Sequence, residues 1–201
     1  MSTRERIISE AIALFAARGF RGTTVGDIEA AAGLTPRSGG LYKHFKSKEA
    51  VLEAAIERHV GEIEAMRPAL EMLPLGDLRA ELTLVGRWAF AELKAEQEIM
   101  RIVQKDGDQF PELVAHVHER IIDRGESQAI DLIARLAEQY DVAVENARAL
   151  AMVALESLVG YRVEERMFGV PPAGIDEEEY IKAWVEVWAT FVHANVAEKV
   201  G

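Results

Sequence analysis

The chain has 201 residues, of which 49% are hydrophobic and 28% charged, enough apolar side chains for one or two folded domains. It has no cysteine, which excludes disulfides, thiolate zinc sites and cysteine nucleophiles. No stretch approaches the roughly 20 consecutive apolar residues of a membrane-spanning helix. The start, MSTRERIISE, has charges where a signal peptide has an apolar run. We therefore expect a cytoplasmic protein that does not enter a membrane.

The net charge of -11 is unevenly distributed along the chain. Residues 1–60 hold nine Lys and Arg against seven Asp and Glu, a balance of +2, whereas residues 61–201 hold 14 against 27, a balance of -13. From Thr35 to Lys48 there are several basic side chains and no acidic residue. Such a patch is typical of a surface that meets phosphate, although a solvated loop would show the same charges.

The first residues of the chain show the pattern of two helices. Apolar residues recur at helical spacing over residues 3–18, and Gly19 ends that run. Thr24 is placed to cap a second, short helix over residues 25–32. Asp27 follows three residues later, as in a capping box.

A tight turn and a third helix are predicted next. Gly33 should end the second helix in a left-handed conformation. Thr35 and Pro36 are a cap followed by a proline at the first helical position, which predicts a third short helix to about Phe45. Two short helices joined by a glycine turn are typical of a helix-turn-helix, whose second helix enters the major groove of DNA.

The rest of the chain is also predicted to be helical, and no strand alternation occurs, so the expected fold class is all-α. Ser47 should cap a helix over residues 48–60, and Pro68, Pro74 and Gly76 should separate it from a helix that starts near Asp77. Later helices are expected over 96–105, 111–122, 126–140 and 144–168, and a last one after Asp176 with the apolar stripe Ile181, Trp184, Val185, Trp188, Phe191 and Val192.

One contiguous string raises the specificity of the helix-turn-helix pattern. FAARGFRGTTVGDIEAAAGLTPRSGGLYKHFKSKEAVLEAAI closely resembles the DNA-binding region of the TetR family of bacterial regulators. That region has a lead of the form G-(F/Y)-x-x-T-(T/S)-(V/I)-x-x-I-A-x-x-A-G-(V/L)-(S/T), then L-Y-x-H-F and S-K-E. The resemblance covers about residues 4–58 position by position, and beyond them it is one of architecture. It implies an N-terminal three-helix helix-turn-helix DNA-binding domain over residues 1–46 and a helical effector-binding and dimerisation domain over residues 47–201.

The resemblance also implies which side chains meet DNA. It makes Thr24, Tyr42, His44 and Lys48 phosphate contacts. Arg37 and Lys43 could reach bases or backbone, and arginine is the better base reader because its fork can bond guanine O6 and N7 together. The candidate DNA-binding residues are Thr24, Thr35, Arg37, Ser38, Gly39, Tyr42, Lys43, His44 and Lys48.

The spacing departs from the family pattern inside this region. The family places its tyrosine seven residues after the turn glycine, whereas Tyr42 follows Gly33 by nine. Counting from Gly33 puts Thr35 at the cap, while counting back from Tyr42 puts Ser38 and Gly39 in the first turn of the recognition helix. A two-residue shift turns an ideal helix by about 200°, so the base-facing residues stay open. The Gly39–Gly40 pair suits either close approach to DNA or a longer loop that absorbs the insertion.

For the second half, the resemblance implies a small-molecule effector and a homodimer formed by the last two long helices. The expected dimer surface is the stripe of the last helix, including Trp184 and Trp188, with one face of 144–168, although a monomeric core would explain the stripe too. Glu156 interrupts an apolar run, so it faces solvent, pairs with an arginine or meets a cationic ligand. The candidates for an apolar pocket with a few polar anchors are Trp88, Phe90, Met100, Gln104, His116, Glu156, Tyr161 and Met167.

These features predict a DNA-binding transcription regulator, a repressor released from a palindromic operator when a small molecule binds. The alternative is a helical ligand carrier or adaptor that does not bind DNA. We expect no enzyme, cofactor or metal, because His116 and His118 would point about 200° apart on a helix and no phosphate-binding glycine loop occurs.

Overall fold

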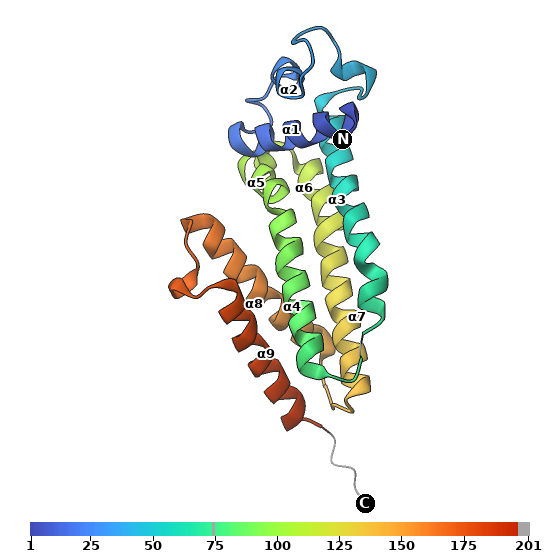
Figure 1. Ribbon diagram of the computed structural model, residues 1–201, viewed down its shortest axis with the longest axis vertical. Coiled ribbons are helices and arrows are strands. Elements are labelled where there is room, and N and C mark those ends of the chain that lie inside the picture. Colours follow the sequence, from blue (N-terminus) through green and yellow to red (C-terminus); the bar gives the residue numbers. More distant parts are fainter. Residues whose placement is uncertain (74, 197–201) are drawn as a thin grey trace, which may run out of the picture. The chain divides into compact units, whose positions relative to one another are not determined.

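The computed structural model describes residues 1–73 and 75–196, which form helices joined by mostly short connections (Figure 1). No strand occurs among these residues, and an isolated bridge joins Val142 to Val196. The predicted all-α fold class is confirmed. Pro74, which the sequence marks as a break between helices, lies outside the described residues.

The α-helices are α1 (Thr3–Arg18), α2 (Val25–Ala31), α3 (Lys48–Glu71), α4 (Leu78–Ala95), α5 (Gln97–Asp106), α6 (Pro111–Val117), α7 (Asp123–Gln139), α8 (Ala147–Phe168) and α9 (Glu177–Ala194). Among the described residues, the short 3-10 segments are η1 (Leu41–Lys43), η2 (Gly107–Gln109) and η4 (Pro172–Gly174). A π-helical stretch, η3 (His118–Ile122), connects α6 to α7 without an intervening loop. Most predicted helices are present within a few residues of their expected ends.

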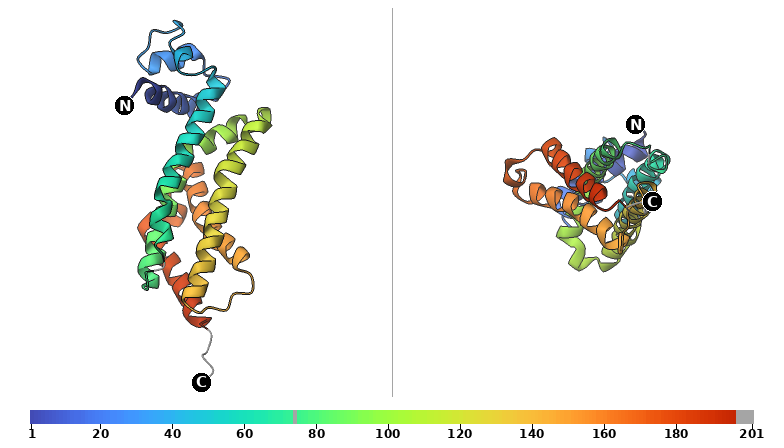
Figure 2. Two further views of the ribbon diagram at one scale, coloured as in Figure 1. Left: turned by 90° about the vertical axis from the view of Figure 1, so that its right-hand side faces the viewer. Right: turned by 90° about the horizontal axis from the view of Figure 1, so that it is seen from below.

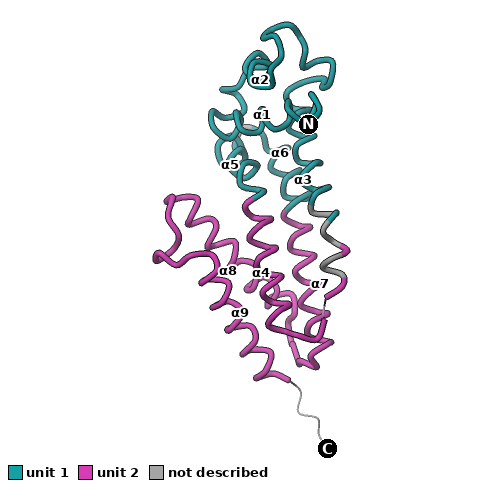
Figure 3. The backbone as a smooth tube through the Cα atoms, in the orientation of Figure 1, with its two compact units in different colours: residues 1–65, 95–121 teal, residues 66–94, 122–201 magenta. Residues whose placement is uncertain are grey.

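The chain forms two compact units (Figure 3). Unit 1 contains residues 1–65 and 95–121, and unit 2 contains the described residues of 66–94 and 122–201. This division differs from the functional boundary expected between residues 46 and 47, which stays a prediction.

The first two helices begin and end as their sequence predicts. The hydroxyl of Ser2 accepts the Glu5 N–H and the Glu5 carboxylate accepts the Ser2 N–H, so α1 starts with a capping box. Thr24 and Asp27 form the same box at α2. The pKa of the Asp27 carboxyl is lowered by hydrogen bonds from Thr24. The bond from the Thr24 side chain has the larger effect and the bond from its backbone the smaller. Gly19, at φ 83°, ends α1 in a conformation that suits glycine.

The predicted third helix is wrong. Residues 35–40 form turns, and the first helical residues after α2 are the three of η1. Arg37 has φ 60° and Gly39 has φ 76°, and two left-handed residues so close together cannot belong to a right-handed α-helix. The insertion is therefore absorbed by a longer turn, one of the two alternatives that the sequence left open.

The helix expected over residues 48–60 is longer than predicted. Its start is correct, because the Ser47 hydroxyl accepts the Ala50 N–H. It continues through Pro68 to Glu71. The segment around the proline is rich in glutamate, alanine and methionine, whose helix propensity outweighs one proline in the last turn.

The core of unit 2 joins α4, α7, α8 and α9. Figure 1 and Figure 2 show α8 and α9 as an antiparallel pair. The Trp184 indole N–H donates to the Ala154 carbonyl at 3.2 Å and to the Ser157 hydroxyl at 3.1 Å, and Trp184 is 7% exposed. The expectation that Trp184 forms part of a dimer surface is therefore wrong, because its side chain is buried in the core of unit 2.

Candidate DNA interface and effector cavity

The recognition segment, defined here as residues 33–48, connects α2 to α3 in unit 1. It begins at Gly33, whose φ of 72° ends α2 as predicted, and the Leu34 N–H donates to the Glu29 carbonyl at 2.8 Å. Left-handed residues follow at 37 and 39. The segment is thus a series of tight turns with one 3-10 turn, and its first turn is hydrogen-bonded to α2.

The candidate DNA-binding side chains of this segment lie mostly at the surface. Tyr42 is 58% exposed. Gly39 and Lys48 are half-buried. The exposed candidates are Thr35, Arg37, Ser38, Tyr42, Lys43 and His44, and the exposed Lys46 lies among them. This arrangement places a basic, hydrogen-bonding surface where phosphate can reach it.

Two of these side chains have local supports. A Cβ atom on Gly26 would lie 3.3 Å from Cγ of Arg37, so the glycine leaves room for the arginine stem beside α2. The Ser38 hydroxyl donates to the Thr35 carbonyl at 2.7 Å, which tightens the turn between them. Thr24 is exposed, but its hydroxyl already caps α2 by accepting the Asp27 N–H at 3.2 Å. Its phosphate contact stays a prediction.

Lys48 has a structural role that the sequence did not reveal. Its ammonium donates to the Phe20 carbonyl at 2.7 Å and to the Thr23 carbonyl at 3.0 Å, and it lies 4.3 Å from the centre of the Phe20 ring. An ammonium has three donors, so one is left after these two bonds. Lys48 holds the start of α3 against the turn that follows α1, and its phosphate contact also stays a prediction.

The end of α5 contacts the last turn of α1 and the residue Phe20 just after it. Lys105 donates to the carbonyls of Ala16 at 2.7 Å and Ala17 at 2.8 Å, which belong to the last turn of α1. The buried carboxylate of Asp106 accepts the Phe20 N–H at 2.7 Å. Neither residue was singled out from the sequence, because nothing in the local pattern shows which helix end they meet.

The candidate ligand residues do not form one group within either unit. Met100, Gln104 and His116 belong to unit 1, and the other five belong to unit 2. His116 Nε2 lies 3.8 Å from the Glu57 carboxylate. Glu156 faces solvent, the first of the three alternatives open to it, and Met167 is 66% exposed.

The remaining three candidates are Phe90 and Tyr161 in the core of unit 2 and the half-buried Trp88 on α4. Phe90 and Tyr161 are buried and their rings pack edge to face at 5.1 Å. The guanidinium of Arg162 lies 4.5 Å from the Phe90 ring centre. The buried indole N–H of Trp88 has no hydrogen-bond partner among the described residues. None of the eight candidates lines the cavity described next.

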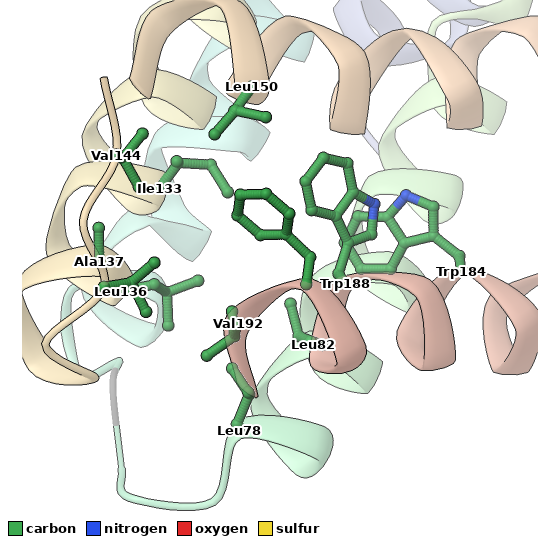
Figure 4. Close-up of a pocket in the computed structure, with 12 residues that line it drawn as sticks. Leu78, Leu82, Ile133, Leu136, Ala137, Val144, Leu150, Trp184, Trp188 and Val192 are labelled. Carbon is green, nitrogen blue, oxygen red and sulfur yellow. The ribbon is translucent and has the colours of Figure 1, made fainter. Parts of the chain in front are cut away.

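Unit 2 contains an apolar cavity of about 40 Å³ (Figure 4). Ile133 and Leu136 of α7 lie on one side of it, with Trp184 and Trp188 of α9 on the other. The complete lining is Leu78, Leu82, Ile133, Leu136, Ala137, Val142, Val144, Leu150, Trp184, Trp188, Phe191 and Val192. The lining is apolar throughout, apart from the two indole N–H groups.

Comparison with known families decides the identity of the fold. Residues 7–55 match the model of bacterial regulatory proteins of the tetR family, and residues 82–194 match the C-terminal domain of AefR-like transcriptional repressors. The chain belongs to the TetR family. It is therefore a DNA-binding transcription regulator, and the resemblance seen in the sequence is confirmed.

Individual TetR-family proteins agree with this assignment. The HTH-type transcriptional regulator YvkB of Bacillus subtilis is 22% identical over 180 residues, 90% of this chain and 92% of that protein. The repressor KstR2 of Rhodococcus jostii is 33% identical over 113 residues, 56% of this chain and 52% of that protein. These relatives are named as transcription regulators, which points away from an enzyme.

Solved structures show the same fold. A TetR-family regulator from Cytophaga hutchinsonii superimposes with a TM-score of 0.67 at 18% identity, covering 98% of this chain and 96% of that one. The fatty acid degradation regulator FadR from Bacillus halodurans gives a TM-score of 0.67 at 18% identity, covering 93% and 94%. No helix among the described residues of this TetR-family chain is long and apolar enough to cross a membrane.

Proposed function

We propose that this TetR-family protein is a repressor that binds a palindromic operator as a homodimer and leaves it when an apolar small molecule binds. It acts in the cytoplasm, without catalysis. The observation that carries the DNA-binding part is the exposed basic recognition segment inside an otherwise acidic chain. Arg37 and Lys43 are the proposed readers of bases or backbone.

The dimer surface is the outer face of α8 and α9. Val153 on α8 is 61% exposed and Val187 on α9 is 63% exposed. Ala183 and Thr190 are exposed four residues before and three residues after Val187, so the three share one helical face. A second copy would cover these side chains, and two copies would present two recognition segments to the two halves of an operator.

The apolar cavity supports the class of effector. Its lining is almost wholly apolar, and the indole N–H of Trp184 is already bonded to the Ala154 carbonyl. The volume of about 40 Å³ is far below the roughly 300 Å³ of a site for a drug-sized ligand. An effector must therefore enlarge the cavity. Because the similarly folded FadR of Bacillus halodurans is a fatty acid degradation regulator, we propose an aliphatic effector here as well.

Linkage connects the two sites. A ligand that binds the enlarged form of unit 2 better than the DNA-bound form must weaken DNA binding by the same factor. The ligand residues predicted from the sequence are part of this proposal only where they belong to the core of unit 2, as Phe90 and Tyr161 do.

The test combines DNA selection with tryptophan fluorescence. The protein is first used to select a duplex from a random pool, and its affinity for that duplex is measured against salt concentration and against saturated fatty acids of increasing length. We expect a steep salt dependence, and a fall in affinity at the acid concentrations that change the fluorescence. Two of the three tryptophans line the cavity, so Trp188→Phe should reduce the fluorescence change while Trp88→Phe should leave most of it.

Each part of the proposal can fail separately. A flat salt dependence on every duplex would favour the alternative of a ligand carrier or adaptor that does not bind DNA. Tight DNA binding that ignores every acid, with unchanged fluorescence, would contradict the aliphatic effector but not the operator.

A further inference from the structure

Glu29 is a carboxylate in a place where the family pattern has alanine. The family lead reads I-A before its turn glycine, whereas this chain has Ile28 followed by Glu29. The Glu29 side chain is fully buried in unit 1, at 0% exposed. Burying a carboxylate is costly unless hydrogen bonds compensate it, so this residue needs a reason.

The carboxylate of Glu29 on α2 is hydrogen-bonded to the backbone of the recognition segment. Its Oε1 accepts the Leu41 N–H at 3.0 Å, and Leu41 is the first residue of η1 and is itself fully buried. The first N–H groups of a helical turn have no partner within the turn, and Glu29 supplies one. Its second oxygen is buried without a hydrogen-bond partner among the described residues, so the site is built around one bond.

Gly40 provides the space for this contact. A Cβ atom on Gly40 would lie 3.3 Å from Cδ1 of Leu34, 3.5 Å from the Ser38 hydroxyl and 3.7 Å from Oε1 of Glu29. A Cβ atom here would press on the leucine side chain and would lie in contact with the carboxylate. Gly39, with φ 76°, reverses the chain just before. The two glycines and the glutamate therefore fit one another.

We propose that Glu29 is the positioning residue for DNA recognition in this chain. The stretch from Gly33 to Tyr42 is two residues longer than in the family pattern. In this chain an irregular turn stands where the family pattern has the first turn of the recognition helix. The buried Glu29 side chain lies between α2 and that turn, and its hydrogen bond to the Leu41 N–H fixes the start of η1. It thereby determines where Arg37 and Tyr42 meet DNA, without touching DNA itself.

The main test compares Glu29→Ala with Glu29→Gln on the duplex that the wild-type protein selects from a random pool. Glutamine keeps an oxygen for the Leu41 N–H, whereas alanine leaves that N–H buried without a partner. We expect Glu29→Ala to lower affinity for the selected duplex about tenfold, with affinity for a scrambled duplex within about twofold, and Glu29→Gln to restore most of the loss. Equal specificity in all three proteins would overturn the proposal, as would equal losses in both variants.

A compensation test asks whether Glu29 and the insertion belong together. Deleting Gly39 and Gly40 returns the spacing from Gly33 to Tyr42 to seven, and adding Glu29→Ala returns the family pattern. We expect the deletion alone to bind poorly, because a buried carboxylate then faces a repacked segment, and the combined variant to regain at least about tenfold in affinity for the duplex it selects itself. Additive losses in the combined variant would contradict the pairing.

The inference rests on DNA binding by this segment, so a measurement without DNA separates the two. Amide hydrogen exchange at Leu41 should be slow in the wild-type protein and in Glu29→Gln, and at least about tenfold faster in Glu29→Ala. Where Glu29→Ala fails to fold, Glu29→Gln and the combined variant decide the matter. Fast exchange at Leu41 in the wild-type protein would overturn the positioning role whether or not the protein binds an operator.

Discussion

One exposed residue of the recognition segment has a strained backbone. Arg37 has φ 60°, a conformation that costs a non-glycine residue about 1–2 kcal/mol. We expect Arg37→Gly to remove this strain, so that the free energy of unfolding rises by up to about 1 kcal/mol. Affinity for the selected duplex should nevertheless fall. Chemical denaturation and DNA titration check both, and Arg37→Ala is the matched control, which should lose the same affinity without the gain in stability.

A half-buried tyrosine, Tyr140, gives a second prediction at this scale. Burial, together with a 3.0 Å hydrogen bond donated to the Glu81 carboxylate, raises the pKa of Tyr140 from 10.0 to about 12. Because the folded pKa lies above the unfolded value, this stabilisation is fully present below pH 10 and is lost as pH rises through about 12. An absorbance titration of phenolate should show a tyrosine that titrates near pH 12 and that Tyr140→Phe removes. Tyr161, whose pKa is also raised by burial, should still titrate late in that variant. A complete titration of all tyrosines near their ordinary pKa would contradict it.

The sequence was informative about residues at the surface and less so about those inside. Tyr42 and Arg37 are exposed as a DNA contact requires, because polar side chains in a short basic turn have no core to enter. The backbone contacts of Glu29, Lys105 and Lys48 could not be predicted from the sequence. Each depends on which backbone group the fold brings beside the side chain. Only the departure from alanine at Glu29 was visible in the family pattern.

At the scale of elements, the contact between α5 and the end of α1 is open to test. The Asp106 carboxylate is 5% exposed and accepts the Phe20 N–H. Asp106→Ala leaves that N–H buried and unbonded, and we expect it to lower the free energy of unfolding by about 1–3 kcal/mol. Asp106→Asn keeps an oxygen acceptor and should lose less. Asp108→Ala, on an exposed neighbour, is the control in the same denaturation experiment. Equal stability of Asp106→Ala and wild type would contradict the contact.

Regular elements were predictable from the sequence and irregular ones were not. Caps at Thr24 and Asp176 lie where the helices begin, as predicted, because a side-chain oxygen at a helix start accepts a backbone N–H that has no partner within the helix. The third helix was mispredicted at Arg37, since a left-handed arginine has no signature in helix propensity. Pro68 was expected to break the helix, and so the continuation of α3 to Glu71 was missed. The helix propensity of the residues around Pro68 outweighs the unfavourable effect of that one proline.

For the whole molecule, the proposed dimer makes the clearest prediction. A carboxylate placed at the centre of an apolar interface is costly, so Val187→Glu combined with Val153→Glu should give a monomer in analytical ultracentrifugation and lose tight binding to the selected duplex. Leu84→Glu is the matched control, because Leu84 is 52% exposed and belongs to α4, which is not part of the proposed surface. A double variant that stays dimeric and binds as before would contradict the proposed surface.

The turns over residues 35–40 have a further consequence for how such a regulator can change. Since the two additional residues lie between helices, neither α2 nor α3 has its register altered by them. Length and composition can therefore vary there while the flanking scaffold stays the same. Grafting loops of different size onto this scaffold, with the residue at position 29 varied alongside, is a practical route to new operator preferences.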